Sequence, residues 1–286
     1  MKNLLRIFET IKTEKNSFQL LRRMRWRNGV YCPKCAVINE NYIHQTKTNG
    51  CRKYRCKSCQ HLFSDTSGSM FHKSKIPLNQ WFYAIYELSQ KKGITSIELA
   101  GKMGISQKKS WAMLHKIRLN LTEISKTFLI KKMKGIVESD EANFGKSRNA
   151  VMGQGVLQRE GIAIIKPITD RTEATLKGNI SSRVCKGSTV ITDTASAYNS
   201  LCCWGYKHHT LNHSKEEFSK GNGVHSNTIE GLWGNLKKII YGVHHGVNKK
   251  NVWKYVAEFL WKYNNREYSQ PFYLLISHLV YPPLSC

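Results

Sequence analysis

Acidic residues are scarce in this sequence. Its 286 residues include 19 Asp and Glu against 45 Lys and Arg, which gives a formal net charge of +26. A pI near 9.8 makes a polyanion the leading partner, and no long basic amphipathic anchor favours a membrane surface over nucleic acid. A positive excess of this size is larger than solubility requires. The composition therefore favours a nucleic-acid-binding protein.

Long hydrophobic runs are also missing. The best candidate for a membrane span, residues 272–280, is short and is interrupted by Ser277 and His278. The first 18 residues carry acids and lysines inside their apolar pattern, unlike the uninterrupted core of a secretory signal. We therefore expect a soluble intracellular protein. Internal repeats and low-complexity tracts are absent from the sequence as well.

Cysteine, in contrast, is present nine times, and a reducing compartment favours metal binding or free thiols over disulfides. Four cysteines form two Cys-x-x-Cys knuckles, Cys32–Cys35 and Cys56–Cys59, with a strand-like insert between them. This spacing is typical of a zinc ribbon, which we place at residues 31–66, and the bound Zn²⁺ would stabilise a fold too small to hold a core alone. Cys51, which lies between the knuckles, could replace one of these four cysteines as a ligand, but the spacing favours that arrangement less.

Helical periodicity lies on both sides of the ribbon. Residues 1–30 form a predicted helical segment whose apolar stripe favours packing on a neighbour over lying along DNA. Residues 75–125 predict a helix and then a helix-turn-helix, with its turn at Gly104–Ser106. Helical pairs that bind nothing share this outline, but a position behind a zinc ribbon in a basic chain favours DNA contact. The predicted packing positions are Ile97, Leu99, Ala100, Ile105 and Leu114. The predicted groove-facing residues are Gln107, Lys108, Lys109 and Trp111.

From residue 134 to 270, strands followed by helices predict an α/β domain with a mixed sheet, which leaves 271–286 as a C-terminal tail. Acidic residues end two of these strands. In the first, Glu138 and Asp140 share one face and Glu141 lies on the other, so strand alternation leaves three candidate acids. Asp193 follows a buried run, where an acid costs free energy unless it is paired or metal-bound, although a solvated acid at a loop edge is common.

Residues 224–238 predict a helix that carries Glu230 and Lys237 on one face, two turns apart. Asn227 to Glu230 also fits a capping box, which would give Glu230 a purely structural role. Lys237 and the adjacent Lys238 favour an active-site role, because a capping glutamate needs no cation on its face, whereas a lysine there could hold a DNA phosphate. A neighbouring apolar stripe consists of Ile229, Leu232, Leu236 and Ile240.

Together these motifs resemble the DDE transposases of bacterial insertion sequences that carry an N-terminal zinc ribbon, a group that includes the eukaryotic Merlin-type transposases. The resemblance covers nearly all of residues 31–266. It is carried by the two knuckles, ESDEANFGK, ITDTASAY, LNHSKEEF, HSNTIEGLWGNLKK and KYNNR. It implies an RNase H-like catalytic domain. The sequence departs from the group's pattern at residues 142–146, where only one of the expected glycines is kept.

By motif position, the resemblance implies that Asp140 and Asp193 are catalytic aspartates, that Glu230 is the third acid and that Lys237 is the trailing basic residue. Asn227 is the alternative third residue, because members of the group vary there. Three such carboxylates would hold two Mg²⁺ (or Mn²⁺) ions for phosphodiester chemistry.

We therefore expect a transposase that binds the terminal inverted repeats of its element, cuts DNA and joins the freed 3′ ends to target DNA. Both ends must be held together, so a homodimer or larger assembly is expected, at the nucleoid of a bacterium or in a eukaryotic nucleus. One rival function is a zinc-ribbon and helix-turn-helix DNA-binding regulator whose RNase H-like domain is inactive. A second is a structure-selective nuclease, which would cut DNA without joining strands.

Overall fold

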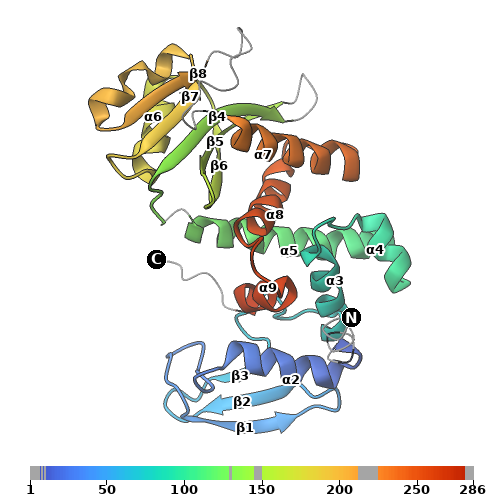
Figure 1. Ribbon diagram of the computed structural model, residues 1–286. Coiled ribbons are helices and arrows are strands. Elements are labelled where there is room, and N and C mark those ends of the chain that lie inside the picture. The colour runs from blue at the N-terminus through green and yellow to red at the C-terminus, as the bar shows by residue number, and fades with distance from the viewer. Residues whose placement is uncertain are drawn as a thin grey trace. The chain divides into compact units, whose positions relative to one another are not determined.

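The computed structural model describes Ile7, Glu9 and residues 11–128, 131–144, 150–211 and 225–280. Parts of five predicted segments therefore lie outside the described residues: 1–6, 8 and 10 at the start, 145–146, residues 212–218 of the motif LNHSKEEF, Val224, and 281–286. The chain divides into two compact units, Met1–Asn120 with Tyr268–Cys286, and Leu121–Glu267 (Figure 1). No helix in the described part of the chain is long and apolar enough to cross a membrane.

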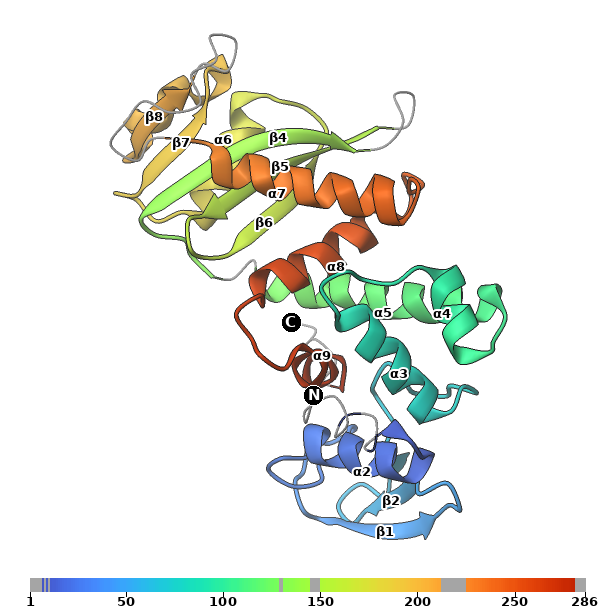
Figure 2. The same cartoon turned by 45° about the vertical axis from the view of Figure 1, so that its right-hand side comes forward.

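The first unit begins with a helix on a small antiparallel sheet. The helix is α2 (Glu14–Arg25), which starts where the Thr13 hydroxyl accepts a hydrogen bond from the Asn16 amide. The sheet has the order β1-β2-β3, and α2 runs along it in Figure 2. Its strands are β1 (Asn41–Thr46), β2 (Arg52–Cys56) and β3 (Leu62–Ser64). Helix and sheet meet where Trp26 packs edge-on against Tyr54, with the ring centroids 5.0 Å apart.

The remainder of the first unit is helical. Its helices are α3 (Leu78–Ser89), α4 (Ser96–Met103), α5 (Gln107–Phe128), whose last turns belong to the second unit, and α9 (Pro271–Val280). Gly104 ends α4 with a left-handed φ of 61°, a conformation that glycine adopts readily. Leu99 and Leu114 are fully buried, but the predicted packing of Ile97 is wrong, because its side chain is 69% exposed. Residues 271–280, expected to be part of a tail, form a helix whose Phe272 packs edge-on against Phe82.

The second unit is built on a five-stranded mixed sheet with the order β6-β5-β4-β7-β8. The strands are β4 (Ile136–Phe144), β5 (Val151–Gln158), β6 (Ala163–Ile168), β7 (Thr189–Asp193) and β8 (Lys207–Leu211). β5 is antiparallel to both β4 and β6, whereas β4, β7 and β8 are parallel. This arrangement confirms the predicted α/β class with an RNase H-like mixed sheet.

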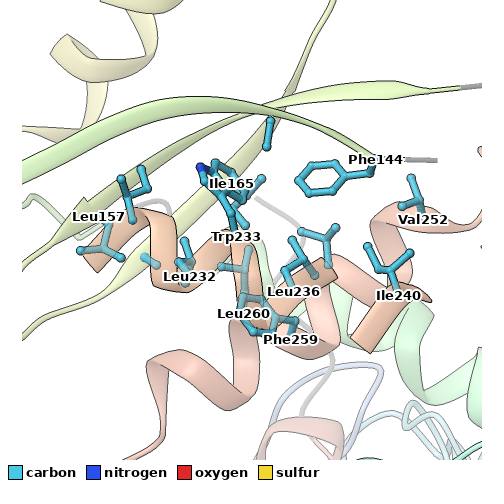
Figure 3. Close-up of a cluster of buried hydrophobic side chains, with 14 residues drawn as sticks. Phe144, Leu157, Ile165, Leu232, Trp233, Leu236, Ile240, Val252, Phe259 and Leu260 are labelled. Carbon is cyan, nitrogen blue, oxygen red and sulfur yellow. The ribbon is translucent and has the colours of Figure 1, made fainter. Parts of the chain in front are cut away.

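Helices cover both faces of this sheet (Figures 1 and 2). The helices α7 (Asn227–Lys237), continued by the π-helical turn η4 (Lys238–Val243), and α8 (Val252–Asn264) cover one face. The helix α6 (Glu173–Arg183) and the 3₁₀ segment η2 (Ser196–Trp204) cover the other. Figure 3 shows the core beneath α7, where Trp233 and Leu236 lie near Phe144 and Leu260. The apolar stripe predicted for α7 is confirmed, since none of its residues is more than 1% exposed: Ile229, Leu232, Leu236 and Ile240.

Candidate metal centre and catalytic site

Four cysteines of the first unit form a metal-sized cluster. The sulfur atoms of Cys32, Cys35, Cys56 and Cys59 all lie within 4.8 Å of one another. The pairs Cys32–Cys59 and Cys35–Cys56 are each 3.6 Å apart. A tetrahedral Zn²⁺ with Zn–S bonds of about 2.3 Å places its sulfurs about 3.8 Å apart, so the cluster fits this ion. The zinc ribbon predicted from the knuckle spacing therefore has the ligand set that Zn²⁺ requires.

The two knuckles have the same local geometry. In each, the residue after the second cysteine has a left-handed φ, 61° at Ala36 and 57° at Gln60. In each, the amide of that residue donates to the carbonyl of the first cysteine, at 2.9 and 3.0 Å. The backbone amide of Cys59 lowers the pKa of Cys56 to about 6, which favours the metal-binding thiolate. Cys51 lies outside the cluster, with its sulfur 3.8 Å from the Arg52 carbonyl oxygen.

In the second unit, the central strands bring two of the predicted acids together. β4 and β7 are parallel neighbours in which Val137 pairs with Val190 and Glu138 pairs with Ile191. Asp140 lies two residues after Glu138, and Asp193 lies two residues after Ile191. Continuing the same pairing places the two aspartates at the same level and on the same face of the sheet. Neighbouring strands lie about 4.8 Å apart. β7 ends at Asp193, but β4 continues past Asp140 to Phe144, so the predicted strand end at Asp140 is wrong. The middle of β4 and the end of β7 thus bring the two aspartates to one level.

Asp140 is held by a side chain of α7. Its Oδ2 accepts a hydrogen bond from the indole N–H of Trp233 at 2.9 Å. Gly155 lies opposite Asp140 in the β4–β5 ladder, and a Cβ atom there would lie only 2.6 Å from the Trp233 ring. Gly155 therefore leaves the space in which the indole reaches across β5 to Asp140. A larger residue would displace the ring from the carboxylate.

Glu138, two residues before Asp140, is fully buried and joins β4 to the start of α7. One of its oxygens lies 2.6 Å from Nε of Arg159, and the other accepts the backbone N–H of Ile229 at 2.8 Å. Arg159 also donates to the carbonyl oxygen of His225, at 2.5 Å. A carboxylate from a distant strand thus satisfies an amide at the N-terminus of α7, where negative charge is stabilised. We call Glu138, Arg159 and Ile229 the α7 clamp.

The start of α7 differs from the predicted capping box. The N-cap is Ser226, and Asn227 is the first helical residue, so the alternative in which Asn227 caps the helix does not hold. The Ser226 hydroxyl donates to Oε1 of Glu230 at 2.7 Å. The α7 clamp supplies the cap instead, because the Glu138 carboxylate reaches Ile229. Local sequence could not reveal this partner, which lies 91 residues away.

Glu230 lies on α7 between the two residues that contact β4. Ile229 binds Glu138, and Trp233, one helical turn after Glu230, binds Asp140. The three predicted acids are nevertheless more widely spaced than the cysteines. Within the described part of the chain, the cysteine cluster is the one group of three or more potential ligands that all lie within 4.8 Å. Lys237 and Lys238 are exposed at the other end of α7.

Glu141 is separated from the candidate site by strand alternation. It accepts a hydrogen bond from the hydroxyl of Tyr198 on the α6 side of the sheet, with Arg171 3.9 Å away. Burial raises the pKa of Glu141, and the negative charges of Asp140 and Asp193 raise it further. The three acids left open by the sequence therefore have different surroundings. Glu138 is clamped, Glu141 faces Tyr198, and Asp140 is beside Asp193.

The predicted DNA-contacting residues of α5 also differ from one another. Gln107, Lys108 and Trp111 are exposed, and Trp111 lies on the His115 ring with the centroids 3.8 Å apart. Lys109 instead donates to the side-chain oxygen of Gln80 on α3, at 3.1 Å. Lys109 thus contributes to helix packing, which the prediction of a groove-facing role did not include.

Three functional neighbours were not singled out from the sequence: Arg159, Trp233 and Gly155. Trp233 could have been found, because it lies one helical turn from Glu230 on the side of the apolar stripe. Arg159 and Gly155 carry no local signal of their partners, which are far away in the chain.

Comparison with known proteins gives two domain matches. Residues 132–264 match the ISXO2-like transposase domain, and residues 12–62 match the transposase zinc-ribbon domain. An uncharacterized protein in transposable element ISH50 of Halobacterium salinarum is 26% identical over 276 residues, covering 88% of this chain and 91% of that protein.

Two solved structures are also similar. The first is the HTLV-2 integrase catalytic core domain in complex with magnesium, at 14% identity and a TM-score of 0.31, covering 46% of this chain and 85% of that one. The second is the Mos1 strand transfer complex, at 10% identity and a TM-score of 0.29, covering 70% and 74% of the two chains.

Proposed function

We propose that this chain, in which residues 12–62 match a transposase zinc-ribbon domain and residues 132–264 match an ISXO2-like transposase domain, is an insertion-sequence transposase that acts on the ends of its own element. In this proposal it binds the terminal inverted repeats, cleaves DNA with Mg²⁺ (or Mn²⁺) and transfers the freed 3′ ends to target DNA. The observation that carries the proposal is the register of β4 and β7, which sets Asp140 level with Asp193 beneath the helix that bears Glu230.

The donor set suits divalent ions. Carboxylate oxygens are the protein ligands that Mg²⁺ prefers, and Asp140, Asp193 and Glu230 would hold the ions. The raised pKa of Glu141 supports this assignment, because two of its causes are the charges of Asp140 and Asp193. A divalent cation would neutralise this concentration of negative charge. When bound, such ions activate the attacking oxygen and stabilise the leaving oxygen of a phosphodiester.

The chain's own residues position these acids. Trp233 orients the Asp140 carboxylate, and the α7 clamp fixes the N-terminus of α7 beside β4. Glu230, which lies between those two contacts, needs to approach the aspartates only when metal and DNA bind. Asn227, one turn earlier on the same helix, is the alternative third residue. Lys237 and Lys238 would bind phosphates of the same DNA.

DNA recognition would come from the first unit. The exposed start of α5 offers Gln107, Lys108 and Trp111 to a groove, with the ribbon as a second contact. Two transposon ends must be held at once during strand transfer, so the active form would be a homodimer or a larger assembly. The transfer step distinguishes this function from that of a structure-selective nuclease.

The test is cleavage of a labelled duplex that carries the element's end. With Mg²⁺ present, wild-type protein should nick this duplex, and Asp193→Ala should lose nicking while it keeps end binding. The matched control is Glu160→Gln, which removes an exposed carboxylate of the same unit and should leave nicking intact. Joining of the labelled end to a second DNA should accompany cleavage.

The rivals predict different results. A regulator with an inactive RNase H-like domain would bind the end and nick nothing at any metal concentration. A structure-selective nuclease would nick but never join strands. Equal nicking by wild type and Asp193→Ala would contradict the assignment of the site.

A further inference from the structure

The first unit contains an open groove of about 810 Å³, bordered by α2 and by the strands β1 and β2. Three arginines line it, Arg22, Arg23 and Arg52, and none of the described residues in its lining carries a carboxylate. The rest of the lining is mixed, with polar, aromatic and apolar residues: Gln19, Asn39, Asn41, Trp26, Tyr54, Gly29, Val30 and Ile43. Arginines in an open groove without acidic residues suit a nucleic-acid strand, because they can bind its phosphates.

A buried aspartate holds the two walls of the groove together. Oδ2 of Asp65 lies 2.8 Å from Arg22 on α2 and accepts the backbone N–H of Arg52 on β2 at 2.7 Å. Its Oδ1 accepts the hydroxyl of Tyr54 at 3.1 Å, and its backbone carbonyl accepts from Arg25 at 2.7 Å. The groove is therefore already formed in this structure, and little ordering would be lost when a ligand binds.

Two polar atoms in the groove's lining residues have no partner. The indole N–H of Trp26 and the side-chain oxygen of Asn41 are buried and make no hydrogen bond within the described part of the chain. The amide nitrogen of Asn41 donates to the Val30 carbonyl at 2.8 Å, which assigns the oxygen as the unpaired atom. An unpaired buried donor or acceptor is unfavourable, so a ligand that reaches both atoms after a small side-chain shift would relieve that penalty.

We propose that this groove is the ribbon's DNA-binding site, in which Arg23 and Arg52 bind backbone phosphates and Asn41 contacts a base edge. Phosphate oxygens only accept hydrogen bonds, so phosphate suits the arginines but not the unpaired oxygen of Asn41. A base edge supplies the missing donor, because the amino groups of adenine and cytosine donate hydrogen bonds. The inference rests on the proposed function, since it specifies where the first unit contacts the element's end.

The rest of the same ribbon provides a matched control. Side chains alternate along β2, so Arg52 and Tyr54 face α2 while Lys53 faces away. Lys57 is exposed in the turn after the strand and is not part of the groove's lining. The variant Arg23→Ala/Arg52→Ala removes two charges from the groove. The variant Lys53→Ala/Lys57→Ala removes two charges from the same ribbon outside the groove.

Binding of full-length, zinc-loaded protein to the element-end duplex would be measured by fluorescence anisotropy over a range of salt concentrations. The groove variant should bind roughly ten- to a hundredfold more weakly, and its slope of log affinity against log salt should fall by about 1.8. The control variant should change affinity by less than about threefold. Zinc content and thermal melting report whether each variant folds, and the single surface change Arg23→Glu should reproduce the loss without touching Arg52.

Base contact has its own readout. Trp26→Phe keeps an aromatic ring against Tyr54 and removes the N–H together with part of the indole, and Asn41→Ser shortens the acceptor. Each should lower the preference for the end sequence over unrelated DNA by about three- to tenfold and leave the salt slope unchanged. Equal losses of DNA affinity in the two double variants would overturn the inference. Unchanged DNA binding in both variants would also overturn it, and is the result expected if the groove binds an acidic protein instead. If groove variants bind normally while Asp193→Ala still loses nicking, the groove assignment fails and the proposed function stands.

Discussion

The two candidate metal sites are held in place in different ways. In the ribbon, the four ligands come from knuckles within 27 residues of each other, and the sulfurs lie within 4.8 Å with two local turns as their support. In the second unit, the acids are positioned by contacts between residues 91 and 93 positions apart, and they do not close into a comparable cluster. A structural zinc site is closed by its ligands, whereas a catalytic site keeps room for substrate. We infer that the ribbon depends on its metal to fold, whereas the second unit positions its acids through contacts between distant residues.

The largest effect that we expect when this comparison is tested is the one caused by loss of zinc. Cys56→Ser removes one of four thiolates, and structural zinc in small domains contributes about 10–16 kcal/mol of apparent binding free energy. We expect the variant to lose zinc and the ribbon to unfold, while the second unit keeps its own melting transition. Zinc content and calorimetry would check this.

Cys51→Ser is the control, because this buried thiol lies outside the cluster. It should retain zinc. If Cys56→Ser retained zinc and Cys51→Ser lost it, Cys51 and not Cys56 would be the zinc ligand.

The next effect concerns the α7 clamp. Glu138→Gln leaves Arg159 largely buried without its countercharge, and breaking a buried ion pair in this way costs about 3–5 kcal/mol. We expect a loss of that order in the free energy of unfolding of the second unit, with the ribbon unaffected. Urea unfolding followed through the tryptophans would measure it.

The control for the clamp is Glu123→Gln, which disrupts an exposed ion pair with Lys126 at the end of α5 in the same unit. Such pairs contribute about 0–1 kcal/mol. Similar losses in both variants would mean that Glu138 is no more important than a surface carboxylate.

A smaller effect is expected at Gly155. A Cβ atom added there would meet the Trp233 ring at 2.6 Å, and overpacking of a core costs about 1–3 kcal/mol. Gly155→Ala should therefore destabilise the second unit by that amount and displace the indole from Asp140. Gly178→Ala on α6, where a Cβ atom would meet nothing within 4 Å, is the control and should be neutral or stabilising. Equal stability of the two variants would show that the indole has other space available.

The sequence predicts best what depends on neighbours in the chain. The knuckle spacing predicted that the four cysteines form one cluster, and helical periodicity predicted the buried stripe of α7. Both predictions depend only on residues a few positions apart in the chain. Strand alternation left all three acids of β4 as candidates. Their separation depends on Arg159, Trp233 and Tyr198, which reach β4 from other parts of the chain.

The wrong predictions have the same origin. Asn227 fits a capping box by local pattern, but Ser226 is the N-cap and Glu138 binds the free amide. Ile97 has the spacing of a packing residue, yet it is exposed on α4. Residues 271–280 were expected to be part of a tail, and they form a helix with a buried face because α3 offers it an apolar surface.

The smallest change that tests the comparison is Trp233→Phe. It removes the hydrogen bond to Asp140 together with part of the ring that packs on Gly155, so we expect a loss of at least about 1 kcal/mol in stability. If the indole orients this carboxylate for metal, cleavage should fall by about tenfold, and the Mg²⁺ concentration for half-maximal cleavage should rise. Trp253→Phe makes the same change in the same core, beside Phe144, and should leave the Mg²⁺ requirement unaltered. A purely structural Trp233 would lower stability in both variants and shift the Mg²⁺ requirement in neither, and the second unit would then position its acids without this long-range contact.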